Sequence, residues 1–176
     1  MTWTAPEVTR PREPYVGDER AMLEGWLEYH RQTLLLKCAG LTAEQLRTAS
    51  VEPSGLTLLG LVRHLAGVER WWFRQRFAGQ QLDTLYWNDA NPNGDFDDVA
   101  DADAEADFAT FHAELDACRA AAAGHDLDET FLRPRRDGTS DEMSLRWVYL
   151  HMIEEYARHN GHADLIRERI DGVIGD

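Results

Sequence analysis

The 176-residue sequence is poor in cysteine and has no long hydrophobic run. Its two cysteines, Cys38 and Cys118, form no CxxC pattern, which excludes the paired-thiol motifs of zinc ribbons and redox centres. We expect both to be small core residues rather than nucleophiles. No apolar stretch reaches the about 18 residues of a membrane span, and the first residues lack the apolar segment of a secretory signal. These absences predict a cytoplasmic protein.

Positive charge is also scarce. There are 18 Lys and Arg residues against 32 Asp and Glu residues, so the net charge is −14 at pH 7. Such a surface repels phosphate backbones and anionic membranes. The composition therefore predicts that neither nucleic acid nor a membrane is a partner.

Acidic residues gather between Asp95 and Asp107. We interpret this stretch as a solvated loop followed by the start of a helix, where negative charge is favourable. A calcium-binding loop is the alternative, but the Gly and terminal Glu spacing of such a loop is missing.

Four long segments have the three- and four-residue apolar spacing of amphipathic helices. Asp18 is a helix-capping residue before the first of them, and Gly40 follows it as a stop. A Thr-Ala-Glu-Gln sequence at 42–45 resembles a capping box. We expect long helices at about 18–39, 57–78, 102–123 and 140–170, and a short one at 42–46.

The connections between these segments differ in length. Residues 1–17 contain three prolines and are expected to form an extended arm. A long loop spans about 80–99, and the connection at 125–141 has room for a short hairpin. We expect one domain at 18–176, with an all-α, antiparallel-type four-helix bundle fold. The long second-to-third connection predicts a crossover.

The last helix carries two polar residues inside its apolar stripe. Glu155 and His159 lie four positions apart and therefore project from one helix face. A buried carboxylate without a partner costs several kcal/mol, so a cation or a buried Arg must compensate. His64, beside the stripe of the second helix, is the best third ligand. The set His64, Glu155 and His159 would leave positions open on a metal ion for water or substrate.

Other interpretations of these residues stay open. His64 alone suits a hydrogen-bonded core histidine, and Glu155 with His159 suits an internal polar pair. His151 and His162 lie close enough in sequence to compete as ligands or to act as hydrogen-bonding neighbours of the ligands. We expect His30, His112 and His125 to be unrelated to the site.

Two segments resemble a known family. The segment SGLTLLGLVRHLAGVERWWF at 54–73 resembles the second-helix signature of the DinB-like superfamily. The segment HMIEEYARHNGH at 151–162 resembles its fourth-helix signature. The resemblance extends from about 18 to 170. It is closest to the actinobacterial branch that contains mycothiol S-transferases and mycothiol-dependent maleylpyruvate isomerase.

The resemblance implies a bundle in up-down-down-up order, with His64, Glu155 and His159 as the metal ligands. Many members have histidine at the position of Glu155, whereas the isomerase-like members have glutamate. Many have glutamine where this chain has His162, which leaves the role of that residue open. The isomerase has a further carboxy-terminal domain, so the single-domain thiol transferases match this length better.

The leading hypothesis is therefore a metal-dependent S-transferase that joins a low-molecular-weight thiol, mycothiol, to an electrophile. The expected ion is Zn²⁺, although Ni²⁺, Fe²⁺ or Mn²⁺ would also suit the ligands. The ligands His64, Glu155 and His159 would be the catalytic residues. Residues near them in sequence that could line the thiol pocket, or serve only in surface pairs and packing, are Arg63, Arg70, Trp71 and Arg158.

Two alternatives belong to other classes. Metal-bound water at the same ligands could hydrolyse an ester or amide. The protein could also be a non-enzymatic module for stress responses or interactions, with a structural metal. A homodimer is expected, because bundles often associate through an exposed apolar face.

Overall fold

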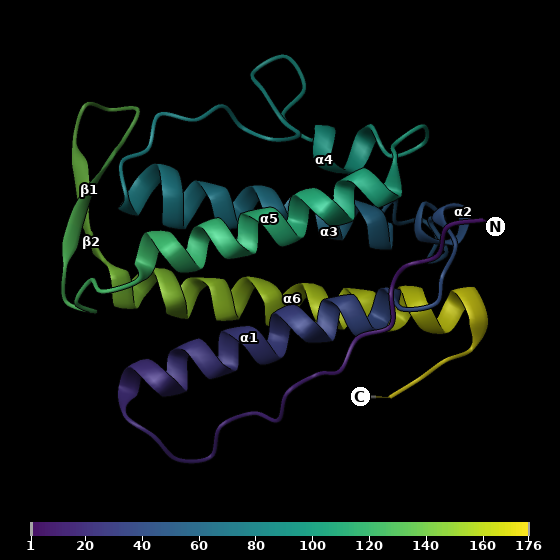
Figure 1. Cartoon of the computed structure of the whole chain (residues 1–176). Helices are drawn as coiled ribbons and strands as arrows, with labels where there is room; N and C mark the ends of the chain where they lie inside the picture. The colour runs from purple at the N-terminus through teal and green to yellow at the C-terminus, as the bar shows by residue number, and fades with distance from the viewer. Residues whose placement is uncertain (1, 176) are drawn as a thin grey trace.

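In the computed structural model, which describes residues 2–175, four long helical segments lie side by side (Figure 1). They are α1 (Glu19–Cys38), α3 (Leu58–Glu69) with its direct continuation η1 (Arg70–Phe77), α5 (Ala104–Ala122) and α6 (Leu145–Asp171). Two short helices, α2 (Ala43–Leu46) and α4 (Gly94–Asp97), and two strands, β1 (Thr130–Pro134) and β2 (Ser140–Ser144), complete the described elements.

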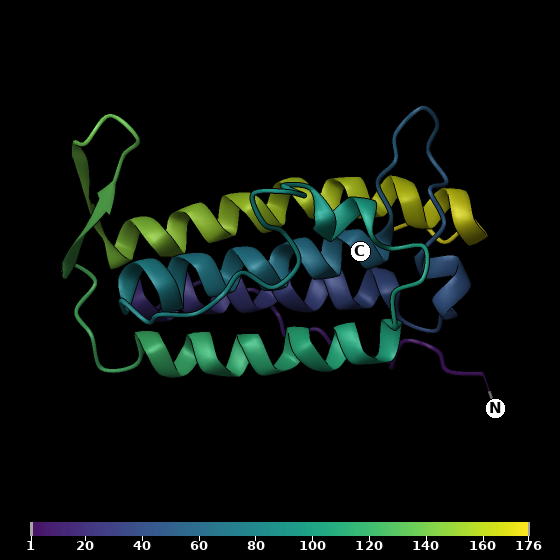
Figure 2. The ribbon, with the colours of Figure 1, turned by 90° about the horizontal axis from the view of Figure 1, so that it is seen from above.

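The long helices are arranged as two closely packed pairs. The most extensive contacts join α1 to α6 and α3 to α5. Helices α1 and α6 run in one direction, and α3 and α5 run in the other (Figures 1 and 2). Because α3 and α5 are parallel, the chain between them must return along the bundle, and α4 lies on this crossover against α3.

The prediction of an all-α four-helix bundle is wrong. Residues 130–144 include an antiparallel pair of strands in which Thr130 faces Ser144 and Pro134 faces Ser140, and this hairpin stands at one end of the helices (Figure 2). Its turn fits its sequence, because Gly138 adopts a φ of +83° that side chains disfavour. The last helix therefore begins at Leu145 rather than near Ser140.

Polar side chains mark most of the helix starts. The Asp18 side chain accepts a hydrogen bond from the backbone N–H of Ala21, and Thr57 accepts one from Gly60. Asp103 and Ser144 do the same for α5 and α6. Each cap satisfies a backbone donor that the helix itself leaves unpaired, so these starts follow from local sequence.

The N-terminal segment is bound to the bundle. Ala5 is buried, and its backbone N–H donates to the Leu41 carbonyl at 2.8 Å. Trp3 packs edge-on against Phe108, with ring centroids 5.4 Å apart. The division of the chain into an arm at 1–17 and one domain at 18–176 stays a prediction.

An almost fully buried ion pair lies among the aliphatic side chains of the core. Arg31 donates through Nε and Nη2 to the two carboxylate oxygens of Glu69, each at 2.7 Å. Tyr156 donates its hydroxyl to the same carboxylate at 3.1 Å. This network joins α1, α3 and α6 in the interior. Both cysteines are buried free thiols, and burial raises the pKa of Cys38 to about 12.

Within residues 2–175, no helix combines the length and the apolar character needed to cross a membrane.

Candidate metal centre

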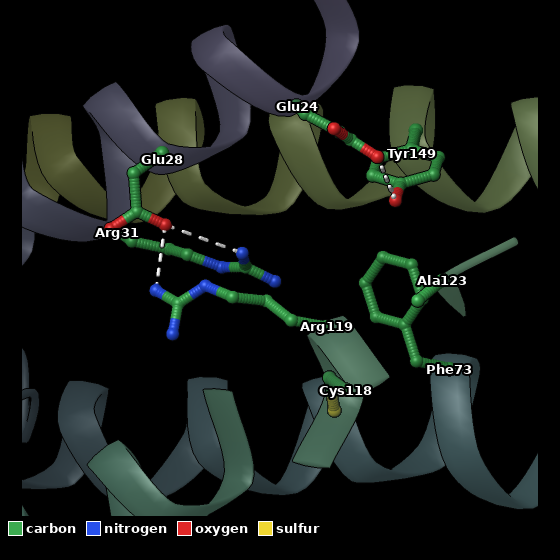
Figure 3. A pocket seen from close by; sticks show the side chains of 8 residues that line it. All are labelled: Glu24, Glu28, Arg31, Phe73, Cys118, Arg119, Ala123 and Tyr149. Carbon is green, nitrogen blue, oxygen red and sulfur yellow. Dashed lines mark hydrogen bonds and ion pairs between the residues drawn. The ribbon is translucent and has the colours of Figure 1, made fainter. Parts of the chain in front are cut away.

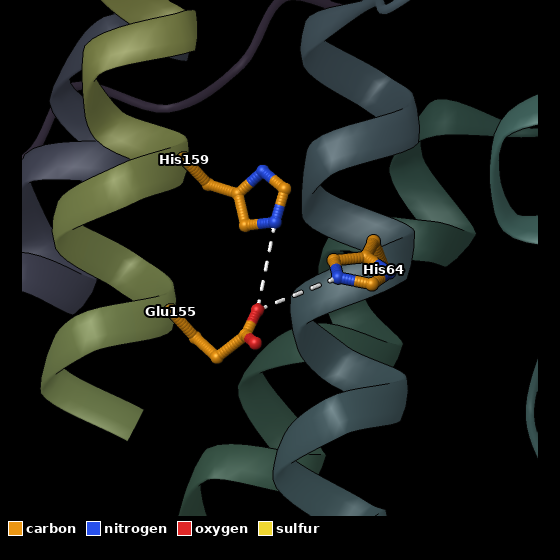
Figure 4. A group of neighbouring side chains, drawn as sticks. All are labelled: His64, Glu155 and His159. Carbon is orange, nitrogen blue, oxygen red and sulfur yellow. Dashed lines mark ion pairs between the residues drawn. The ribbon is translucent and has the colours of Figure 1, made fainter. Parts of the chain in front are cut away.

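Three half-buried side chains from the facing helices α3 and α6 converge (Figure 4). His64 comes from α3, and Glu155 and His159 come from successive turns of α6. Oε2 of Glu155 lies 3.8 Å from Nε2 of His64 and 3.6 Å from Nε2 of His159. The three residues each offer one donor atom, and these atoms lie within 4.8 Å of one another.

The donor set fits a small divalent cation. Ligand distances of about 2.0–2.1 Å to Zn²⁺ would place tetrahedral donor atoms about 3.3 Å apart, a few tenths of an ångström less than the two separations from Glu155. Two imidazoles and one carboxylate are also ligand types of catalytic zinc sites. Within residues 2–175, the basic side chains within 4 Å of the Glu155 carboxylate are the imidazoles of His64, His151 and His159, and no Arg or Lys is among them.

The carboxylate of Asp95 bonds to the other ring nitrogen of His64. Oδ2 of Asp95 lies 2.7 Å from Nδ1 of His64. Because an ionised carboxylate only accepts hydrogen bonds, Nδ1 donates to it, which leaves Nε2, on the side of Glu155, as the nitrogen that would bind a metal ion. Asp95 is buried. A carboxylate that orients a ligating histidine in this way is the usual companion of a metal site.

The electrostatics of the group favour positive charge. Burial lowers the pKa of His64, but its hydrogen bonds to Asp95 and Glu155 outweigh burial and raise the pKa to about 9. Hydrogen bonds from His159 and His64 hold the pKa of Glu155 well below its usual range. Two carboxylates thus surround the His64 ring, and a proton or a metal cation would each be stabilised there.

The competing histidines lie at the edges of the group. Nε2 of His151 is 3.7 Å from the other oxygen of Glu155, and its ring stacks on Trp147 at 4.6 Å. Together with Glu154 and Glu155, His151 forms a second possible ligand group. Nδ1 of His162 lies 3.3 Å from Nδ1 of His159, where a hydrogen bond would orient the latter ring.

Of the residues proposed to line a thiol pocket, Trp71 borders a cavity beside His64 and Glu155. Arg63 instead donates to the backbone carbonyls of Gly94 and Asp95, each at 3.1 Å, so it fixes α4 against α3. Arg70 turns to α5, where it pairs with Glu114 at 2.5 Å, and Arg158 is exposed on α6.

The cavity beside the centre has a volume of about 180 Å³. Besides the two polar side chains, it is lined by Val68, Trp71, Trp72 and Trp87. The sequence alone did not identify Asp95, Trp72 or Trp87 as members of the site. Asp95 and Trp87 come from the crossover, and the available signals were a Gly94-Asp95 pair and an aromatic pair, Tyr86-Trp87, in an otherwise polar loop.

A larger cavity, of about 510 Å³, lies elsewhere, and it is lined by residues of α1, η1, α5 and α6 and by Ala123, which directly follows α5 (Figure 3). Its charged groups satisfy one another. Glu28 pairs with Arg119 at 2.8 Å and with Arg31 at 3.5 Å, and the Tyr149 hydroxyl donates to Glu24 at 3.2 Å. None of its lining residues belongs to the His64 group, so the smaller cavity is the candidate substrate site.

The fold and the site together define a class: mostly helical bundle proteins with a three-residue candidate metal centre between facing helices. The family model for mycothiol S-transferases matches residues 22–172. Since the match covers most of the chain, the protein belongs to the mycothiol S-transferase family, and the resemblance seen in the sequence is confirmed. The comparisons with curated proteins and with solved structures gave no match.

Proposed function

We propose that the protein is a metal-dependent mycothiol S-transferase, in which His64, Glu155 and His159 bind one divalent cation. The observation that carries this proposal is the convergence of their donor atoms from α3 and α6 at the edge of a cavity. Zn²⁺ suits two imidazoles and one carboxylate best. Family membership supports a small-molecule thiol and an electrophile as substrates.

A cation bound at these ligands supplies Lewis-acid activation, which lowers the pKa of a coordinated thiol. The remaining steps concern the chain and the substrates. Asp95 holds the His64 ring in one tautomer, and the negative charge of Glu155 keeps the sulfur nucleophilic. A sulfur lone pair forms the new C–S bond, the leaving group departs with its bonding electron pair, and the thiol proton passes to solvent.

The test begins with elemental analysis of untagged protein. We expect about one zinc ion per chain, lost in His64→Ala and in His159→Ala. The matched control is His112→Ala, because His112 is exposed on α5 and should not affect metal content. Metal-loaded protein should then conjugate mycothiol to an electrophile such as 1-chloro-2,4-dinitrobenzene.

Two results would contradict the proposal. One is a wild-type protein that takes up no metal even when zinc is supplied. The other is a loaded protein without thiol-conjugating activity across a panel of thiols and electrophiles. Thiol-independent hydrolysis of esters or amides by the loaded protein would favour a hydrolase instead.

A further inference from the structure

We propose that the cavity walled by Trp71, Trp72 and Trp87 is the subsite for the electrophile, that it accepts one flat apolar ring, and that Trp87 sets its size. The reaction of the bound ring rests on the proposed function, whereas the binding of the ring to the cavity does not.

The first wall is built by an unusual helix. After Glu69 the α-helical pattern gives way to π-helical turns, and the Ala78 N–H bonds to the Phe73 carbonyl five residues earlier at 3.1 Å. Such segments are rare and often mark functional sites. Here the neighbouring side chains Trp71 and Trp72 both line the cavity.

Both of these rings are held in place by neighbours. The guanidinium of Arg76 stacks over Trp71, 3.9 Å from the ring centroid. Trp72 is buried and meets Trp147 and His151 edge-on at centroid distances of 4.9 and 5.0 Å. The wall is therefore preformed, as in most small-molecule sites.

The wall formed by Trp87 depends on a glycine. A Cβ added to Gly67 of α3 would lie 2.0 Å from Cζ3 and 2.4 Å from Cη2 of Trp87, so the indole occupies the space that a side chain would fill. Thr84 donates its hydroxyl to the Trp87 carbonyl and helps to fix the loop. The crossover thus places the Trp87 indole beside the site, in space that is free only because residue 67 is glycine.

The dimensions of the cavity select its ligand. An engineered apolar cavity of about 150 Å³ holds benzene, whereas drug-sized ligands need about 300 Å³ or more. At about 180 Å³, the cavity has room for a single ring but not for a sugar-based thiol. Apolar walls suit the ring, while His64 and Glu155 mark the end where its reactive carbon would lie.

The test measures ring binding to the full-length protein, without added thiol, by isothermal titration calorimetry. Benzamide is the flat probe, cyclohexanecarboxamide is a non-planar probe of similar size, and naphthalene-1-carboxamide is an oversized one. We expect wild type to prefer benzamide. Trp87→Ala should weaken benzamide binding about tenfold, because a ring face is lost, and should admit the naphthalene probe. Trp87→Phe should retain benzamide binding.

A pair of glycine variants tests the wall without removing the indole. Gly67→Ala should displace Trp87 and weaken benzamide binding as Trp87→Ala does. Gly161→Ala is the matched control, because Gly161 is also helical and an added Cβ meets nothing within 4 Å there. Circular dichroism of each variant identifies any loss of fold, and Trp87→Phe keeps the test decisive if Gly67→Ala does not fold.

Wild-type protein that binds no ring probe, or that binds benzamide no better than the folded Trp87→Ala variant does, would overturn the proposal. If thiol conjugation proceeds but benzamide binding is absent, only this inference fails. If the ring binds as expected but metal uptake and conjugation are absent, the proposed function fails and the cavity assignment stands. In an active protein, benzamide should compete with the electrophile and not with the thiol.

Discussion

Asp95 contacts the candidate metal centre only through His64. It belongs to an acidic stretch that we interpreted from sequence as solvated, yet its carboxylate is buried and bonded to Nδ1 of His64. Only the fold of the crossover distinguishes it from the exposed acids around it, such as Asp97. From this contact we infer that Asp95 orients His64 rather than touching a substrate.

Replacement of Asp95 by Asn should weaken zinc binding about 10- to 100-fold, the usual effect of losing such a partner. The amide keeps the size of the side chain but no longer fixes the imidazole tautomer. Asp97→Asn, on the same short helix and exposed, is the control. Competition with a chelator of known affinity measures the change, and equal affinities in both variants would contradict the orienting role.

At the scale of elements, the bundle is joined internally by the Arg31–Glu69 pair and Tyr156. The pair is almost fully buried, with side-chain exposures of 5% and 0%. Burying two charges is costly, and their mutual hydrogen bonds offset that cost only while both partners remain. The network therefore makes the relative placement of α1, α3 and α6 depend on one carboxylate.

Glu69→Gln should lower the free energy of unfolding by about 3–5 kcal/mol, because it leaves the Arg31 charge buried without a counter-charge. Glu168→Gln, which changes an exposed residue of α6, should stay within about 0.5 kcal/mol of wild type. Urea denaturation at pH 7 measures both variants. A loss below about 1 kcal/mol in Glu69→Gln would show that solvent or other groups compensate the arginine.

At the scale of the whole molecule, the acidic composition sets the response to pH. Burial raises the pKa of Glu114, but hydrogen bonds from Arg70 and Arg74 outweigh burial and lower it below the ordinary value of 4.5. Hydrogen bonds from Arg135 and Arg133 lower the pKa of Asp141 to about 2. Such groups stabilise the fold fully above their unfolded-state pKa, and the stabilisation is lost as pH falls through the folded-state value.

We therefore expect the melting temperature to fall steeply below about pH 4.5. Glu114→Gln should melt lower than wild type at pH 7, and this difference should shrink as the solution is acidified below pH 4.5. Glu105→Gln, an exposed acid of the same helix, should melt as wild type does throughout. Thermal melts from pH 7 to pH 2.5 at fixed salt test this, and a constant Glu114→Gln difference would contradict it.

The expected homodimer and the expected cytoplasmic location stay predictions. Sedimentation velocity tests the first.

Local sequence determined the helices and half of the site. Apolar spacing and capping residues such as Asp18 and Thr57 act within a few positions, so the starts of the first three long helices could be predicted from them, whereas the last begins at Leu145 rather than near Ser140. The pairing of Glu155 with His159 on one face is also local, because four residues make about one helical turn. A short hairpin was allowed within 125–141, but its strands extend to Ser144, because strand pairing joins residues farther apart in the chain than helical spacing does.

Tertiary structure alone decided what surrounds that pair. His64 faces Glu155 because α3 packs against α6, and Asp95 and Trp87 reach the site because the crossover folds back over α3. The Trp87 indole packs directly against Gly67, in space that a side chain at position 67 would fill. This contact joins two separate segments of the chain, and the sequence pattern of neither segment predicts it. These contacts join residues far apart in the chain, and they form only when the helices have packed and excluded water.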